Sequence, residues 1–297
     1  KTGSPVEPED ILAGRYKDLT KDIMVTTATD GNHGRSVAWG ARLLGCPCRI
    51  YIHKQVSQGR KKAMEALGAE VIQIDGTYDD SVNFATQEAE EFGWNIISDT
   101  SYEGYMEIPR YILAGYTVMV EEIFSQLDGN DLPTHIFLQG GVGGLASAIA
   151  AYAWEKFGAN CPRIVVVEPS KAPCLMASAI SGQPTTVTIT EETMMAGLSC
   201  GKASLLSWAI LEQATDDFVT IPDTHVAEMM RTLSKGVDGD PKIVAGESAV
   251  AGLAALDMAR AKPETFAALD LDADSHVLII GTEGATDPEI YNRIISE

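Results

Sequence analysis

Short apolar segments alternate with amphipathic stretches along the first part of the chain. Runs of β-branched and aromatic residues predict strands, and apolar residues that recur every three or four positions predict helices. Because each strand is followed by a helix, the pattern is typical of βαβ units, whose strands form a parallel sheet. We expect strands at residues 24–28, 49–52, 70–74 and 95–98, and helices at 36–44, 58–67, 79–92 and 108–126.

A second α/β series follows the turn-forming segment Asp128–Pro133, which is the best candidate for a linker. Arg163–Glu168 is almost continuously apolar, as expected of a strand buried on both faces. The sequence therefore predicts an α/β fold with two open, mostly parallel twisted sheets and helices on both faces, divided into domains at 21–127 and 128–297. Further strands are expected at 135–139, 163–168 and 277–280, and helices at 145–156, 205–214, 225–234 and 248–260.

Composition narrows the class of protein. The 297 residues are 45% hydrophobic and 22% charged, with a mean hydropathy of +0.00, which fits a globular protein and excludes a disordered or collagen-like chain. No apolar run approaches the ~20 residues that a membrane-spanning helix needs, so no membrane partner is predicted. The histidines are scattered without a metal-ligand spacing, so no metal site is predicted.

Charge and cysteine content indicate the partners and the compartment. The formal net charge of -20 repels phosphate backbones and argues against nucleic acid as a partner. The five cysteines form no C-x-x-C pair and are expected to be reduced thiols, as in a cytoplasmic protein. A small cationic or zwitterionic ligand is favoured over a polyanion.

Two glycine-containing turns each lie between a predicted strand and a predicted helix, where backbone N–H groups can bind an anion. The first, Thr29–Gly34, fits a ligand-binding turn and equally a simple strand-to-helix turn capped by Asp30 or Asn32. The second, Gly140–Gly144, has four glycines in five residues. That is more than helix packing is expected to need, and it favours phosphate binding.

Other polar residues also follow predicted strands, where open α/β sheets bind ligands. Asp99 and Thr282 are of this kind, although each also fits an ordinary cap or turn. A rival interpretation uses the second glycine turn differently. Gly141-x-Gly143-x-x-Ala146 fits a dinucleotide fingerprint, and Glu168 ends the next strand, where it would bind a ribose hydroxyl.

Taken in order, these motifs resemble the fold-type II pyridoxal-phosphate enzymes, the tryptophan synthase β-like group, over nearly the whole chain. In serine and threonine dehydratases of this group a small residue stands where this chain has Asp30, so that position discriminates between the families. Four segments are similar to the diaminopropionate ammonia-lyase family in particular: Thr27–Arg35, Asp99–Tyr105, Met194–Gly201 and Gly281–Asp287.

The resemblance implies pyridoxal 5'-phosphate as cofactor and the α,β-elimination of 2,3-diaminopropionate to pyruvate and two molecules of ammonia. Asp30 and Asp99 are the implied catalytic residues, because carboxylates attract the extra ammonium group of this substrate and can carry protons. The other implied roles are main-chain contacts to the cofactor phosphate by Gly140, Gly141, Val142, Gly143 and Gly144, a hydrogen bond to the phenolic oxygen by Asn32, a contact to the pyridine nitrogen by Thr282, and substrate carboxylate binding by Thr29, Gly31 and His33.

The Schiff-base lysine of the family lies in a Phe-Lys-x-x-Gly-like context, which no lysine of this chain has. We therefore expect it upstream of Lys1, and we expect residues 1–20 to be the remnant of the N-terminal part of the larger domain. The resemblance also implies a cytoplasmic homodimer. The alternatives that stay open are a serine/threonine dehydratase, a dinucleotide-dependent oxidoreductase and a non-catalytic homologue that binds pyridoxal phosphate.

Overall fold

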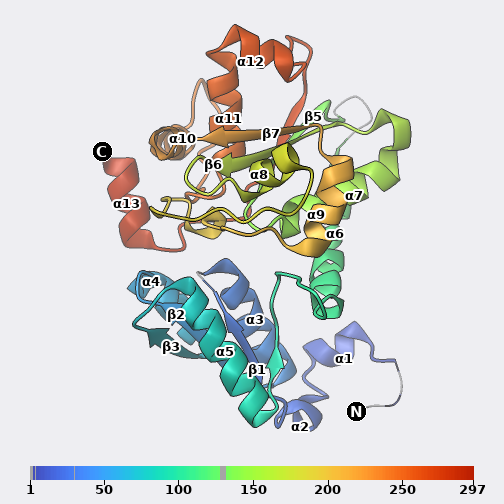
Figure 1. The fold of residues 1–297 in the computed structure, drawn as a ribbon, viewed down its shortest axis with the longest axis vertical. Helices are drawn as coiled ribbons and strands as arrows, with labels where there is room; N and C mark the ends of the chain where they lie inside the picture. Colours follow the sequence, from blue (N-terminus) through green and yellow to red (C-terminus); the bar gives the residue numbers. More distant parts are fainter. Residues whose placement is uncertain (1–2, 4, 30, 128–131) are drawn as a thin grey trace. The chain divides into compact units, whose positions relative to one another are not determined.

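The computed structural model describes residues 3, 5–29, 31–127 and 132–297. They form two compact units, Lys1–Ser98 with Thr286–Glu289 (unit 1) and Asp99–Ala285 with Ile290–Glu297 (unit 2). Each unit contains a four-stranded sheet whose strand pairs are all parallel, with helices on both faces (Figure 1). The predicted fold class is therefore confirmed.

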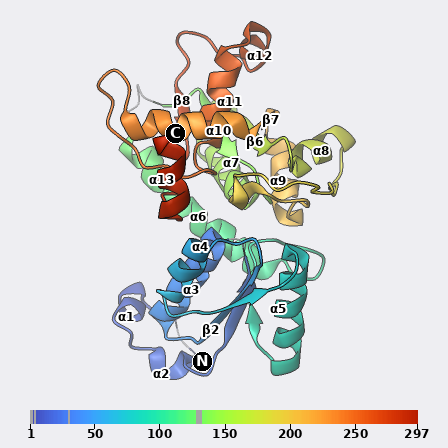
Figure 2. The same ribbon diagram turned by 90° about the vertical axis from the view of Figure 1, so that its left-hand side faces the viewer.

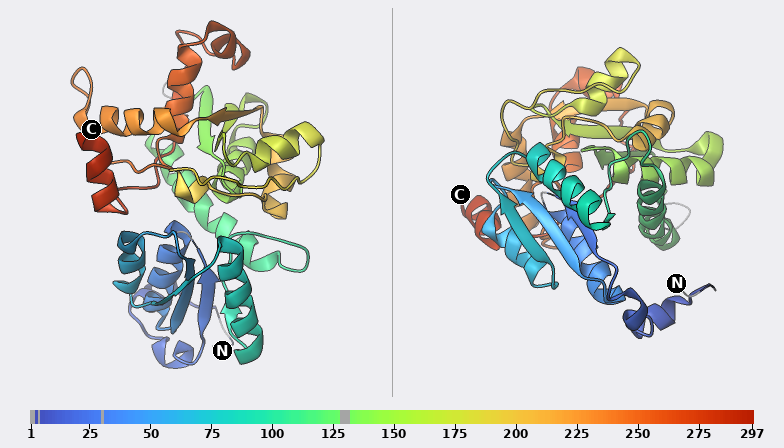
Figure 3. Two further views of the ribbon diagram at one scale, coloured as in Figure 1. Left: turned by 60° about the vertical axis from the view of Figure 1, so that its left-hand side comes forward. Right: turned by 60° about the horizontal axis from the view of Figure 1, so that its bottom comes forward.

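The sheet of unit 1 has the strand order β3-β2-β1-β4. Ile50 and Ile52 of β2 and Met64 of α4 are fully buried in its core. Helices α3 and α5 lie on opposite sides of the strands (Figure 2 and the left panel of Figure 3). The elements of this unit are α1 (Pro8–Leu12), α2 (Lys17–Thr20), β1 (Val25–Ala28), α3 (Asn32–Leu44), β2 (Cys48–His53), α4 (Gln58–Glu65), β3 (Glu70–Ile74), α5 (Tyr78–Phe92) and β4 (Asn95–Ile96).

The sheet of unit 2 has the strand order β7-β6-β5-β8. Its elements are α6 (Glu107–Gln126), β5 (His135–Gln139), α7 (Gly144–Phe157), the 3-10 helix η1 (Gly158–Asn160), β6 (Arg163–Pro169), α8 (Cys174–Ser181), the 3-10 helix η2 (Ala196–Leu198), α9 (Leu205–Ala214), β7 (Asp217–Ile221), α10 (Asp223–Lys235), α11 (Ala251–Arg260), α12 (Pro263–Ala268) and β8 (Val277–Ile279). The last helix, α13 (Pro288–Ser296), begins in the segment assigned to unit 1 and continues in unit 2.

Both faces of the unit 2 sheet are buried. Phe137 and Val165 belong to the hydrophobic cluster that includes residues of α10 and α11, whereas Ile136 and Ile164 belong to the cluster that includes residues of α6, α7 and α9. Figure 1 shows these two groups of helices on opposite sides of the strands. Since successive residues of a strand point to opposite faces, burial on both sides explains why the central residues of β5 (136–138) and β6 (164–167) are all apolar.

The boundary between the units differs from the predicted domain boundary after residue 127. The units divide after Ser98, and α6 belongs to unit 2 because its residues Val120 and Phe124 pack in the same cluster as Ile136. Of the predicted linker, residues 128–131 lie outside the described part of the chain. Within the described ranges, every helix is too short or too polar to cross a lipid bilayer.

Candidate active site

The turn after β1 is organised by the side chain of Thr29. This residue is 5% exposed, and its hydroxyl oxygen accepts hydrogen bonds from the backbone N–H groups of Gly31, at 3.1 Å, and Gly34, at 3.2 Å. Its own backbone N–H donates to the carbonyl of Tyr51 in β2 at 3.1 Å. Thr29 thus holds the backbone between β1 and α3 in place. Asp30, the predicted catalytic residue of this turn, lies outside the described residues.

Glycine is required in this turn for space. A Cβ atom on Gly34 would lie 2.4 Å from Cγ2 of Thr29 and 2.6 Å from Sδ of Met64, closer than non-bonded atoms can approach. A Cβ atom on Gly31 would lie 3.2 Å from Nη1 of Arg60, so this guanidinium is packed against the turn. Arg60 is 6% exposed and brings a positive charge next to the predicted binding segment for the substrate carboxylate.

Asn32 and His33 begin helix α3 and differ in their surroundings. Asn32 is exposed at the helix N-terminus. His33 is half-buried, and its Nε2 lies 2.8 Å from the carbonyl oxygen of Ile97, just after β4. One ring nitrogen of His33 therefore fixes the start of α3 to the end of a neighbouring strand. Its implied contact with the substrate stays a prediction.

The glycine loop of unit 2 joins β5 to α7. The N–H of Gly140 donates to the carbonyl of Val167 at 2.8 Å, and the N–H of Gly143 donates to the carbonyl of Gly140 at 3.1 Å, which closes a tight turn. Gly141 has φ +62° and Gly143 has φ +96°, a region that favours glycine. Because α7 begins at Gly144, the N–H groups of its first turn have no acceptor within the helix and are suited to an anion.

Close packing favours glycine at three of the four glycine positions in this loop. The sequence pattern indicated that helix packing needs fewer glycines. A Cβ atom would lie 2.8 Å from Cγ of Glu168 at Gly140, 3.2 Å from the carbonyl oxygen of Gly197 at Gly141, and 3.0 Å from Cδ1 of Leu211 at Gly143. Only at Gly144 is the nearest atom an ordinary contact, Cε2 of Tyr116 at 3.9 Å.

Glu168 does not have the role that the dinucleotide hypothesis gave it. The residue is fully buried, and its two carboxylate oxygens accept the backbone N–H groups of Leu175 and Met176, each at 2.8 Å, at the start of α8. Burial raises its pKa to about 7, although these amides and the Cys174 thiol oppose the rise. Because both oxygens are occupied in the interior, Glu168 cannot bind a ribose, and the dinucleotide interpretation is wrong.

Asp99 begins unit 2 and lies near Tyr116 of α6. Its Oδ1 accepts the Thr100 hydroxyl at 3.3 Å. Burial, followed by the negative charge of Asp99, raises the pKa of Tyr116 to about 12. The ring of Tyr116 also lies beside Gly144, at the start of α7. The structure therefore brings a predicted catalytic carboxylate, a phenol and the end of the glycine loop into one region of unit 2.

Sequence reasoning missed Tyr116 and Arg60. Tyr116 is one of three aromatic residues in the long amphipathic helix α6, where aromatic residues are typical of ordinary packing. Arg60 belongs to α4, and nothing in its local sequence relates it to the turn after β1. Only the tertiary fold makes either residue a neighbour of a candidate segment.

Thr282 is exposed in the segment after β8, and its neighbours are firmly held. Glu283 is 4% exposed; its Oε2 accepts the N–H of Ser248 at 2.7 Å, and its carbonyl accepts the N–H of Gly246 at 2.9 Å. The segment Gly246–Ser248, just before α11, is therefore hydrogen-bonded to the residue that follows Thr282.

Gln139 connects the Thr282 segment to the glycine loop within unit 2. It is the last residue of β5, and its Nε2 donates to the carbonyl of Ile280 at 3.0 Å. Gly140 follows Gln139 directly, and Thr282 comes two residues after Ile280. Both segments thus leave the same edge of the sheet, where the carboxyl ends of its parallel strands lie.

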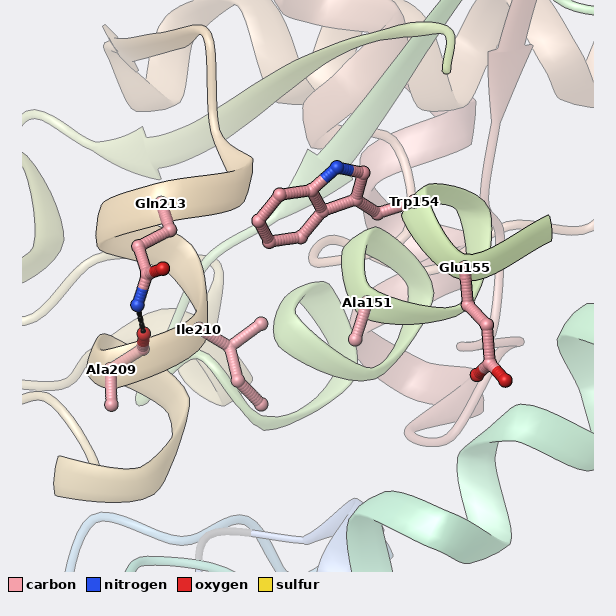
Figure 4. A pocket seen from close by; sticks show the side chains of 6 residues that line it. All are labelled: Ala151, Trp154, Glu155, Ala209, Ile210 and Gln213. Atoms are coloured by element: carbon pink, nitrogen blue, oxygen red, sulfur yellow. Dashed lines mark hydrogen bonds between the residues drawn. The ribbon is translucent and has the colours of Figure 1, made fainter. Parts of the chain in front are cut away.

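Two pockets in unit 2 lie away from these residues. One, of about 390 Å³, is lined by the second halves of α7 and α9, whereas the glycine loop ends at the first residue of α7. Figure 4 shows the Trp154 ring in this pocket and Gln213, whose Nε2 donates to the carbonyl of Ala209 at 3.1 Å. The other, of about 450 Å³, includes Thr134 and Arg163 at the amino ends of β5 and β6. Neither is part of the candidate site.

Comparisons with known proteins agree with these features. The pyridoxal-phosphate dependent enzyme family matches residues 11–282. A diaminopropionate ammonia-lyase of Salmonella typhimurium is 41% identical over 287 residues, which cover 94% of this chain and 71% of the relative. The crystal structure of the holo diaminopropionate ammonia lyase from Escherichia coli superposes with a TM-score of 0.87 at 34% identity and covers 96% of this chain and 79% of that one.

A more distant structure shares the fold alone. The processed form of threonine deaminase isoform 2 from Solanum lycopersicum has a TM-score of 0.75 at 20% identity over 96% of this chain and 78% of that chain. The two parallel sheets and the matched family define a fold-type II enzyme that uses pyridoxal phosphate. Within that class, this chain belongs to the diaminopropionate ammonia-lyase family.

Proposed function

We propose that this protein converts 2,3-diaminopropionate to pyruvate and two molecules of ammonia by α,β-elimination. The observation that carries the proposal is the 41% identity to a diaminopropionate ammonia-lyase across 94% of this chain. The match to the pyridoxal-phosphate dependent enzyme family over residues 11–282 also spans the Asn32 turn, the glycine loop and Thr282. The serine dehydratase alternative shares the fold, but no structural observation favours it.

The residues present fit pyridoxal phosphate. The loop Gly140–Gly144 has no side chains at four of its five positions, and it leads into the N-terminus of α7, so its main-chain N–H groups are suited to the phosphate. Asn32 would hydrogen-bond the phenolic oxygen and Thr282 the pyridine nitrogen. When bound, the cofactor supplies a place for the electron pair left at the α-carbon.

The neutral hydroxyl of Thr282 does not force the pyridine nitrogen to stay protonated. A less strongly electron-withdrawing ring favours loss of a β-substituent over transamination. This choice of residue therefore supports an elimination reaction, in keeping with the proposed activity.

The substrate carries one carboxylate and two amino groups, and the proposed contacts match these charges. Thr29, Gly31 and His33 would lie near the carboxylate, and the Arg60 guanidinium beside Gly31 adds a positive charge there. Asp30 and Asp99 would attract the ammonium group that serine lacks, and would accept or donate protons. Tyr116, with its pKa at about 12, keeps its proton at neutral pH and can donate a hydrogen bond near Asp99.

A direct assay tests the proposal. The purified protein, supplied with pyridoxal phosphate, should release pyruvate from diaminopropionate much faster than from serine, with two ammonia molecules for each pyruvate. A protein with no turnover of diaminopropionate, or with faster turnover of serine, would contradict the proposed substrate.

The cofactor attachment point, the oligomeric state and the compartment are further parts of the proposal. Borohydride reduction of the holoenzyme followed by peptide mapping should identify the lysine that binds the cofactor. Light scattering after size-exclusion chromatography should give the mass of a homodimer. The free thiols of the five cysteines support a cytoplasmic location, which cell fractionation would test.

A further inference from the structure

Two serines that are 103 positions apart in the sequence form a buried pair in unit 2. The hydroxyl oxygens of Ser101 and Ser204 lie 2.7 Å apart, and the backbone N–H of Ser101 donates to the Ser204 hydroxyl at 3.0 Å. Ser101 is 1% exposed and Ser204 is 0% exposed. Since buried hydroxyls are costly unless hydrogen-bonded, the two residues depend on each other.

Each serine of the pair is also bonded to a second segment, Ser101 to the start of α9 and Ser204 to the glycine loop. The Ser101 hydroxyl accepts the N–H of Leu206 at 2.7 Å, and the Ser101 carbonyl accepts the N–H of Leu205 at 3.2 Å, so Ser101 caps the start of α9. The backbone N–H of Ser204 donates to the carbonyl of Val142, inside the glycine loop, at 2.9 Å. The pair therefore ties the segment that carries Asp99 to the loop that carries Val142.

We propose that Ser101 and Ser204 are positioning residues that hold Asp99 at a fixed place relative to the glycine loop. The inference rests on the proposed function, because it assigns the pair to that reaction. Asp99 is only two residues from Ser101, whose N–H, carbonyl and hydroxyl are all hydrogen-bonded. Fixing these three groups limits the movement of the Asp99 backbone.

The consequence for the reaction follows from the geometry of proton transfer. A carboxylate exchanges a proton only within hydrogen-bond reach, and a displacement of about 1 Å can cost on the order of a hundredfold in rate. Loss of the Ser204 hydroxyl would leave the Asp99 segment attached to α9 but loosened from its buried partner. The glycine loop would keep its shape, because the turn from Gly140 to Gly143 is closed by its own hydrogen bond.

A double-mutant cycle separates this role from a purely structural one. The holoenzyme, its Ser204→Ala and Asp99→Asn variants and the double variant are compared with diaminopropionate as substrate. We expect Ser204→Ala to lower kcat by about 10- to 100-fold with a change in KM below about threefold, as for a displaced catalytic group. If Ser204 acts through Asp99, the kcat of the double variant should be no more than about twofold lower than the kcat of Asp99→Asn alone.

Ser178→Ala is the matched control, because Ser178 is also 0% exposed and its hydroxyl bonds backbone groups within unit 2, the carbonyl of Cys174 at 2.7 Å and the N–H of Thr185 at 2.9 Å. It should lower the melting temperature while leaving kcat within about twofold, since it removes a buried hydrogen bond away from Asp99. Should Ser204→Ala fail to fold, Ser101→Ala takes its place in the cycle, because it removes the other hydroxyl of the pair and likewise leaves the backbone bond from Ser204 to Val142 intact.

The outcomes distinguish the two proposals. The positioning role would be overturned if the kcat losses of the two single variants multiplied in the double variant, or if Ser178→Ala lost as much kcat as Ser204→Ala. In either case, wild-type activity on diaminopropionate would still uphold the proposed function. A wild-type holoenzyme that does not act on diaminopropionate would overturn both.

Discussion

The hydroxyl oxygen of Thr29 lies 3.2 Å from the backbone nitrogen of Gly34 and accepts its hydrogen bond. Thr29 also leaves no room for a side chain at position 34, because a Cβ atom on Gly34 would come within 2.4 Å of Cγ2 of Thr29. The hydroxyl and the missing side chain are therefore complementary. Together they set where the backbone leaves β1 and where α3, with Asn32 as its first residue, begins.

Gly34→Ala should disrupt this turn. The added methyl group would overlap Thr29 and would also lie 2.6 Å from Sδ of Met64, a residue with no exposed surface. We expect a loss of about 1–3 kcal/mol in the free energy of unfolding, the usual cost of overpacking, and weaker binding of pyridoxal phosphate because Asn32 is displaced. Urea unfolding and an absorbance titration with the cofactor measure the two effects.

Gly40→Ala is the control for that substitution. Gly40 lies in the same helix, α3, and a Cβ atom there would meet nothing within 4 Å. Alanine should raise the free energy of unfolding by about 0.5–1 kcal/mol, since it forms helices better than glycine. If Gly40→Ala were as destabilising as Gly34→Ala, the contact with Thr29 would not be the cause.

Gly143→Ala should weaken cofactor binding by changing the glycine loop. Gly143 has φ +96°, and its Cβ atom would lie 3.0 Å from both Leu211 and Ser207, so the loop must shift to accept it. The shift would misplace the amides at the start of α7, and we expect the dissociation constant for pyridoxal phosphate to rise at least about tenfold, the effect of losing ~1.4 kcal/mol. Gly115→Ala in α6, where a Cβ atom meets nothing within 4 Å, should leave the constant unchanged.

Most strands and helices of the two units follow from the sequence because their hydrophobic pattern is strong. The central residues of β5 (136–138) and β6 (164–167) are apolar without interruption, because both faces of these strands are covered. The pattern is weak at β7, whose first four residues are only half-buried, and in α8, whose start is set by the distant carboxylate of Glu168. Neither was predicted, because tertiary contacts rather than local periodicity define them.

The candidate site shows the same limit. A glycine run after a strand predicts a loop that can bind a phosphate, and the structure places it at a helix N-terminus. The sequence does not say which glycines are needed for packing, because Glu168, Gly197 and Leu211 come from other parts of the chain. The sequence also suggested that Glu168 is accessible to a ligand at the end of its strand. The local sequence does not show that the start of α8 covers this residue.

Asp30→Ala should alter substrate preference rather than only activity. We expect it to reduce pyruvate release from diaminopropionate more than release from serine, because the Asp30 carboxylate would attract the additional ammonium group that serine lacks. Steady-state kcat/KM for both substrates gives the comparison. An equal loss on the two substrates would refute the discriminating role of Asp30.

The buried carboxyl of Glu168 should make stability depend on pH. Its pKa is raised from 4.5 to about 7, mainly by burial, so the folded protein prefers the protonated form. Its contribution to stability is therefore fully present below pH 4.5 and is lost as the pH rises through about 7. A shift of this size corresponds to roughly 3 kcal/mol.

Glu168→Gln removes this titration, because the amide is neutral at every pH in this range. At pH 5 we expect the variant to be less stable than the wild type by about 1 kcal/mol, since its NH₂ group cannot accept the second of the two α8 N–H groups. Between pH 5 and pH 8 the difference should shrink and then reverse, because only the wild type must bury a charge. Urea unfolding of both proteins at several pH values measures the difference directly. If the free energies of unfolding of the two proteins plotted against pH stayed parallel over this range, Glu168 would keep the same protonation state when the protein unfolds.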